Sequence, residues 1–124
     1  MNLQIEGDRL KINLSFLEKL LTLQFNYAFE IPLEHVERVS TEKPSASGLK
    51  YRMPGTEIPG LIAAGTYYSD RGREFWYVTG DRHYLVLDLK NEFYQKIVLT
   101  LEQNETWAER LSTEICDFFE KSQI

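Results

Sequence analysis

The chain has 124 residues, of which 43% are hydrophobic and 27% charged, and its formal net charge is −5. This length is enough for a domain with a hydrophobic core, so we expect a single domain over residues 1–124. The negative charge argues against general attraction to nucleic acid or to anionic membranes. No apolar run approaches the ~20 residues of a transmembrane segment, and the first residues lack the pattern of a signal peptide. With Cys116 as the single cysteine, we expect a reducing, cytoplasmic location.

Near the amino terminus, apolar and polar side chains alternate, which is the period-two pattern of a strand. Leu3 and Ile5 are followed by Gly7-Asp8, and the alternation resumes with Leu10 and Ile12. Glycine beside an acidic residue suits a two-residue turn. The segment therefore predicts a tight β-hairpin.

The next segment, "SFLE" at residues 15–18, matches a helix capping box. In this motif the Ser15 hydroxyl and the Glu18 carboxylate each accept a hydrogen bond from a free backbone amide of the first turn. The motif predicts a short helix near residues 16–22.

Period-two alternation recurs later in the chain, over residues 25–31, 84–89 and 96–101. Strands with one apolar and one mixed face are typical of antiparallel sheets whose second side meets water. Short loops that suit hairpins separate the later strands, at residues 69–73, 79–82 and 90–92. Consecutive hairpins predict a meander, which must curl to avoid exposed edges.

The last segment predicts a helix from about Glu105 to Lys121, with Asn104 as its N-cap. Its apolar side chains fall on one stripe, which we expect to face the core: Trp107, Leu111, Ile115 and Phe118. The predicted fold is mainly β, an antiparallel barrel of about seven or eight strands capped by this C-terminal α-helix.

Two stretches resemble a family of small bacterial pleckstrin-homology-like (PH-like) proteins, largely of unknown function. They are "FEIPLEHVERVSTE" at residues 29–42 and "MPGTEIPGLIAAGTYYSDRGREFWYV" at residues 53–78. The resemblance implies a PH-like barrel and a binding module. Pleckstrin-homology domains that bind inositol phosphates carry several cations around the first hairpin, whereas this chain has only Arg9 and Lys11 beside Asp8 there. Because such a head group needs several converging cations, we expect no phosphoinositide binding.

The two Pro-Gly pairs, Pro54-Gly55 and Pro59-Gly60, suit tight turns because proline presets φ and glycine accepts positive φ. They either turn the chain from one sheet to the next or form a neutral loop whose glycine amides meet a ligand.

The aromatic residues around the loop at 69–73 allow two interpretations. Tyr67, Tyr68 and Trp76 either fill the core and pair across strands, or form an exposed ladder that marks a partner surface, since aromatic residues are enriched at interface hot spots. The possible partner-binding surface consists of Pro54, Gly55, Pro59, Gly60, Tyr67, Tyr68 and Trp76.

Candidate catalytic and metal-binding residues are few. His35 lies near Glu34 and Glu37, but the spacing matches no zinc or calcium motif, so we expect a surface histidine. His83 shares the parity of the apolar face of the following strand and should be partly buried at the barrel mouth. Cys116 lies on the flank of the helix among acidic residues, which favour an unreactive thiol. With no hydrolase or phosphate-loop motif present, we expect no catalytic residue, metal or cofactor.

Two functional hypotheses follow. The favoured one is a non-enzymatic PH-like binding module that recognises a protein partner or self-associates. The alternative is a small-ligand carrier or enzyme that uses the barrel mouth near His83 and the loop at residues 54–60. A carrier needs polar groups at inward positions, whereas the inward positions here are aliphatic: Leu85, Leu87, Leu89, Ile97, Leu99 and Leu101.

Overall fold

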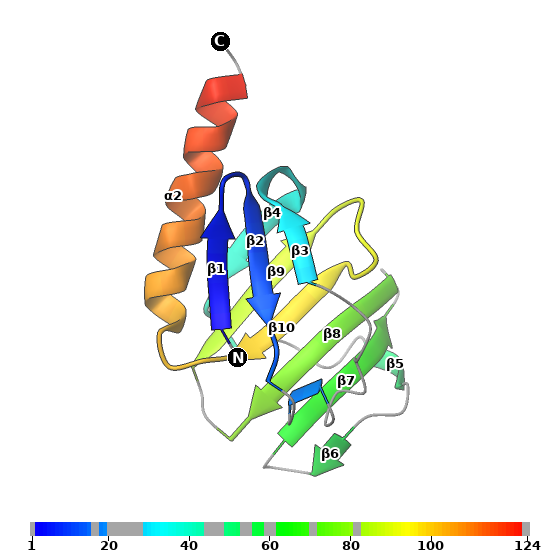
Figure 1. Cartoon of the computed structure of the whole chain (residues 1–124). Helices are drawn as coiled ribbons and strands as arrows, with labels where there is room; N and C mark the ends of the chain where they lie inside the picture. Colours follow the sequence, from blue (N-terminus) through cyan, green and yellow to red (C-terminus); the bar gives the residue numbers. More distant parts are fainter. Residues whose placement is uncertain are drawn as a thin grey trace.

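A computed structural model of the chain (Figure 1) describes residues 2–15, 18–19, 29–43, 49–52, 56–58, 62–69, 72–80 and 83–122. Its elements are β1 (Asn2–Glu6), β2 (Arg9–Asn13), β3 (Phe29–Pro32), the 3₁₀-helix η1 (Leu33–His35), β4 (Val36–Ser40), β5 (Leu49–Arg52), β6 (Thr56–Ile58), β7 (Ile62–Ser69), β8 (Gly72–Thr79), β9 (Tyr84–Leu89), β10 (Lys96–Thr100) and α2 (Asn104–Ser122).

The strands form two sheets. The small sheet has the order β1-β2-β3, and the large seven-stranded sheet has the order β4-β9-β10-β8-β7-β5, with β6 paired to β7. In Figure 1 the small sheet lies in front of β4, β9 and β10, and α2 contacts β4, η1 and β9. The mainly β fold with a C-terminal helix is confirmed. The described strands are more numerous than predicted, and they form two sheets rather than a closed barrel.

Two local predictions at the amino-terminal end are confirmed. Glu6 pairs with Arg9 across the turn between β1 and β2, and Gly7 takes a φ of 62°, as a tight turn with glycine at its first central position requires. In the capping box, the Glu18 amide donates to Ser15 Oγ at 3.2 Å and the Ser15 amide donates to Glu18 Oε1 at 2.7 Å. Most of the helix predicted near 16–22, and the strand residues 25–28, lie outside the described residues.

The predicted meander is wrong at one connection. Residues 79–82 do not close a hairpin, because β10 lies between β8 and β9 and pairs with β8 in parallel. The loop after β9 does close a hairpin, since β9 and β10 pair antiparallel from Asp88↔Lys96 to Tyr84↔Thr100. Alternation assigns each side chain to a face, but it does not say which strand becomes the neighbour.

The main core lies between the large sheet, the small sheet and α2. The predicted inward residues of β9 and β10 are buried there, with Leu101 half-buried against them. The expectation that the second face of the large sheet meets water is wrong, since Trp76, Val86 and Val98 are buried on that side with Tyr67. Both faces of the central strands therefore carry buried apolar side chains.

Helix α2 begins at Asn104, a residue earlier than predicted. The side-chain amide of Asn104 (Nδ2) donates to the Tyr84 carbonyl oxygen at 2.8 Å. This hydrogen bond connects the start of the helix to β9. Leu111 is fully buried, and Trp107 and Ile115 pack against the core, as the stripe predicted. Phe118 lies outside the described side chains. Among the described residues, no helix combines the length and the apolar content needed to cross a bilayer.

Candidate functional site

The residues predicted to form a partner surface differ in their exposure to solvent. Tyr67 and Trp76 are only 7% and 6% exposed, with ring centroids 5.6 Å apart. The Trp76 indole donates to Glu74 Oε1 at 3.1 Å. The exposed ladder around Trp76 is therefore not formed, because these two rings are buried and pack diagonally across β7 and β8. Tyr68 is half-buried, and Pro54, Gly55, Pro59 and Gly60 lie outside the described residues.

A different surface is built around the β9–β10 loop, residues 90–95. Three backbone hydrogen bonds fix this loop to three places in the fold: the Lys90 amide donates to the His35 carbonyl at 2.9 Å, the Leu89 amide to the Gln95 carbonyl at 2.8 Å, and the Gln95 amide to the Arg73 carbonyl at 2.8 Å. Asn91 takes a φ of 56°, in the left-handed region that asparagine tolerates better than most residues. The loop is therefore held to η1, to its own hairpin and to β8.

Two side chains anchor the same loop. Tyr94 is 1% exposed, and its hydroxyl lies 2.9 Å from Thr66 Oγ1 within the core. Glu92 Oε1 lies 3.0 Å from His35 Nδ1. Phe93 therefore lies between two anchored residues, one held by burial of its ring and the other by a polar contact.

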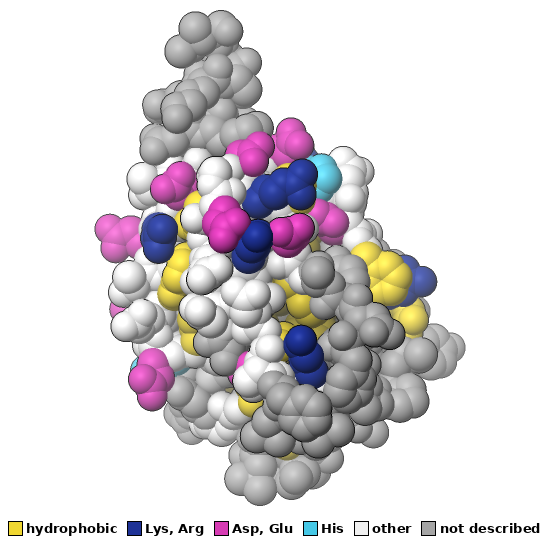
Figure 2. All heavy atoms as spheres, viewed as in Figure 1, with side chains coloured by type: hydrophobic (Ala, Val, Ile, Leu, Met, Phe, Trp, Pro, Cys, Tyr) yellow, Lys and Arg dark blue, Asp and Glu magenta, His cyan; other side chains and the backbone are white. Residues whose placement is uncertain are grey.

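Phe93 is 50% exposed, and it is the one large hydrophobic side chain found exposed among the described residues. The Arg73 guanidinium carbon lies 4.3 Å from the Phe93 ring centroid and 5.9 Å from the Tyr68 ring centroid. Tyr68 and Arg73 are direct cross-strand partners on β7 and β8. We call these three residues the aromatic–arginine patch. Figure 2 shows hydrophobic side chains with a basic side chain against them at the right-hand edge, on the side where the β9–β10 loop lies in Figure 1.

A polar hollow of about 460 Å³ lies on the other side of the loop. It is lined by Glu37, Glu74, Asp88, Leu89, Lys90, Asn91, Gln95 and Lys96. Glu37 follows the buried Val36, so alternation turns its side chain away from the core, and the β4–β9 register is irregular at this point, between Val36 and Arg38. Lys96 Nζ lies 3.8 Å from Asp88 Oδ1. The charge of Lys96 is therefore partly balanced by another residue that lines the same hollow.

A second hollow, of about 380 Å³, lies beside Trp107 and Leu101. Neither hollow is lined by His83. The prediction of a partly buried His83 is wrong, because His83 is exposed. It precedes the first residue of β9, so the alternation of that strand does not fix the direction of its side chain.

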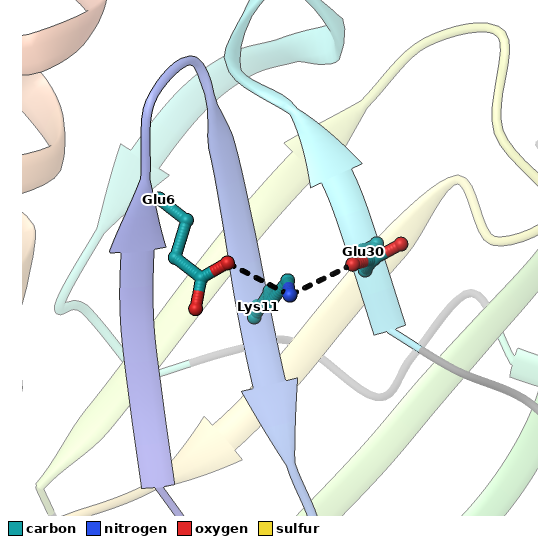
Figure 3. A network of polar contacts seen from close by, with 3 residues as sticks. All are labelled: Glu6, Lys11 and Glu30. Atoms are coloured by element: carbon teal, nitrogen blue, oxygen red, sulfur yellow. Dashed lines mark ion pairs between the residues drawn. The ribbon is translucent and has the colours of Figure 1, made fainter.

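The outer face of the small sheet is polar. Lys11 Nζ lies 2.8 Å from Glu6 Oε2 and 3.1 Å from Glu30 Oε1, on the neighbouring strands β1 and β3 (Figure 3). The hydrogen bonds to Glu6 and then to Glu30 raise the pKa of Lys11, and their negative charges act in the same direction. The lysine of the first hairpin therefore already has two carboxylate partners.

The remaining candidate residues do not gather into a site. Cys116 is exposed on α2. His35 contacts Glu92 rather than its sequence neighbours Glu34 and Glu37. No group of three or more histidine, cysteine or carboxylate side chains suited to a metal occurs in the described part of the chain. The sequence analysis did not single out Phe93. Its signal is the aromatic pair Phe93-Tyr94, which lies in a turn before the alternation of the next strand begins.

Comparison of the chain with protein-family models, with curated proteins and with solved structures finds no match.

Proposed function

We propose that the protein is a non-enzymatic PH-like binding module that recognises a protein partner through the aromatic–arginine patch. The observation that carries this proposal is Phe93, a half-exposed ring on a loop tied to η1 and β8. Aromatic residues, phenylalanine included, and arginine are enriched at protein interfaces relative to the rest of the surface. The patch joins both kinds on one small surface.

The way the loop is held supports binding at this place. Association costs conformational entropy when loops and side chains must become ordered. Here the backbone hydrogen bonds at both ends of the loop, the buried Tyr94 ring and the contact between Glu92 and His35 already order it in the free protein. A ring presented in this way loses little further freedom on binding.

The PH-like assignment is the fold proposal that goes with this function. It is supported by the two resembling stretches at residues 29–42 and 53–78 and by the mainly β fold with its C-terminal helix. We further propose that phosphoinositides are not the ligand, because Lys11 is engaged by Glu6 and Glu30. The alternative of a small-ligand carrier has less support, since the inward residues of β9 and β10 are apolar and buried.

Quantitative affinity capture from the native cell tests the proposal. The bait proteins are the natural chain, the Phe93→Ala variant and an Arg9→Ala control, which changes an exposed residue of the first hairpin. Loss of a hot spot costs at least about 2 kcal/mol, or roughly thirtyfold in affinity. We expect the partner to be lost with Phe93→Ala and kept with Arg9→Ala. Retention of every captured protein by Phe93→Ala would show that the patch is not the recognition surface.

Self-association is the second form of the same proposal. Sedimentation of the natural chain over a range of concentrations measures it directly. If a second copy occupies the patch, the mass should rise with concentration and Phe93→Ala should abolish the rise. If the mass rises equally in both proteins, the contact lies elsewhere.

A further inference from the structure

We infer that the partner presents an acidic side chain next to an apolar one, and that Arg73 binds the carboxylate. This inference rests on the proposed function of the patch and names the chemistry of the segment that fits it. It depends on how the guanidinium is held and on the charges around it.

Arg73 is held by its backbone and by the two rings. Its main chain pairs with Tyr68 in the β7–β8 ladder, and its carbonyl oxygen accepts from the Gln95 amide at 2.8 Å. The guanidinium carbon lies within 4.3 Å of the Phe93 centroid, a distance at which a cation is attracted to the ring face. An arginine beside an aromatic ring can at the same time bind a carboxylate bidentately, through the N–H donors of its planar fork.

No described carboxylate neutralises the charge of Arg73. Arg73 is exposed, and no ion pair joins it to a described carboxylate. The nearby acids have other contacts: Glu92 lies against His35, and Glu74, on the opposite face of β8, accepts from the Trp76 indole. A cation that lies over an aromatic ring, and that no described carboxylate neutralises, is a prepared site for an anion.

The kind of anion follows from the number of cations. A phosphate group carries a charge of about −1.5 to −2 at neutral pH, so one guanidinium leaves part of it unbalanced, whereas the single charge of a carboxylate is matched by one guanidinium fork. Arg73 is the one cation of the patch among the described residues. The site therefore fits the carboxylate of an aspartate or glutamate better than a phosphorylated residue or a lipid head group. The exposed Phe93 ring beside it favours an apolar side chain next to that acid.

Selection from a random peptide display library tests the inference. The folded full chain is panned as the natural protein, as Arg73→Glu, as Arg73→Gln, as Phe93→Ala, and as Arg9→Glu. The last variant is the matched control, because it makes the same change of charge at an exposed arginine outside the patch. Thermal melts of each variant ensure that only folded proteins are compared.

We expect the natural chain and Arg9→Glu to enrich peptides with an acidic residue next to an apolar one. Arg73→Glu should reverse the preference toward basic residues. Arg73→Gln should lower the affinity for the selected acidic peptides by roughly tenfold to a hundredfold, as loss of a charge-assisted hydrogen bond predicts. Phe93→Ala should remove the enrichment altogether.

The outcomes separate this inference from the proposed function. If Phe93→Ala removes the enrichment but Arg73→Glu still selects acidic peptides, the patch binds and the role of Arg73 is wrong. If neither variant changes the selected peptides, the patch itself is not the binding surface. If the natural chain enriches no acidic peptide over background, the inference of an acidic segment fails.

Discussion

His35 Nδ1 lies 3.0 Å from Glu92 Oε1, although the two residues are separated by 57 positions in the chain. The contact joins η1 to the β9–β10 loop beside the hydrogen bond from the Lys90 amide to the His35 carbonyl. It therefore fixes the loop that carries Phe93 to a different part of the fold.

Weakening this contact should loosen the loop with little effect on the rest of the protein. Both side chains are partly exposed, at 25% and 16%, so Glu92→Gln should cost only about 0.5–1 kcal/mol of unfolding free energy. Hydrogen exchange of the loop amides should increase at the same time. Glu34→Gln, an exposed acid on η1, is the control. A double-mutant cycle with His35→Gln measures the coupling, and zero coupling would show that the pair does not hold the loop.

Helix α2 should be an integral part of the core. Leu111 is fully buried in the main core, so Leu111→Ala should lower the unfolding free energy by about 2–5 kcal/mol. Glu109 is exposed on the same helix, and Glu109→Ala should stay within about 0.5 kcal/mol. Denaturant melts compare the two variants. Equal stability would mean that the helix is not packed on the core as described.

The capping box should make stability depend on pH. Burial raises the pKa of Glu18, but the hydrogen bonds to its carboxylate, including that from the Ser15 amide, outweigh burial, so the pKa is lowered from the ordinary value of 4.5. The folded protein therefore binds its proton less readily than the unfolded chain. The stabilisation is complete above the unfolded pKa and is lost as pH falls through the folded one.

Glu18→Gln isolates this effect, because glutamine keeps the capping geometry and removes the charge. We expect the natural chain to be more stable by roughly 0.3–1 kcal/mol at neutral pH. Urea melts at a series of pH values should show the difference shrinking below the ordinary carboxyl range. A difference that stays constant with pH would contradict the assignment to the Glu18 charge.

Trp76 should be shielded from solvent. Trp107→Phe leaves Trp76 as the single tryptophan of the chain, and Trp76→Phe leaves Trp107. Because Trp76 is 6% exposed and Trp107 is half-buried, acrylamide should quench the fluorescence of Trp76 less. Faster quenching of Trp76 would restore the interpretation of an exposed aromatic ladder.

Phosphoinositide-containing vesicles should not bind the protein. The lysine of the first hairpin is engaged by Glu6 and Glu30, and the net charge of −5 repels an anionic surface. Co-sedimentation at low salt is the most permissive measurement, since screening is weakest there. Binding that depends on the head group would overturn this prediction.

The sequence by itself determined the features that depend on neighbours along the chain. Gly7 specifies the first turn, Ser15 and Glu18 form the capping box, and the apolar stripe of α2 places Leu111 in the core. In each case the residue pattern and the interaction lie within a few positions, so local geometry is sufficient.

Only the tertiary structure decided which distant segments meet. The backbone edges of β8, β9 and β10 offer the same hydrogen-bonding groups. The residues of the loop at 79–82 therefore do not predict that β10 lies between the other two strands. That insertion, with the hairpin loop it creates, brings Glu92 to His35 and Phe93 to Arg73. It also makes β8 and β10 parallel neighbours and buries Trp76 with Val98, on a face that alternation alone assigns to water. Period-two alternation fixes the face of a side chain, whereas the neighbour of a strand is chosen by the free energy of the whole packed core.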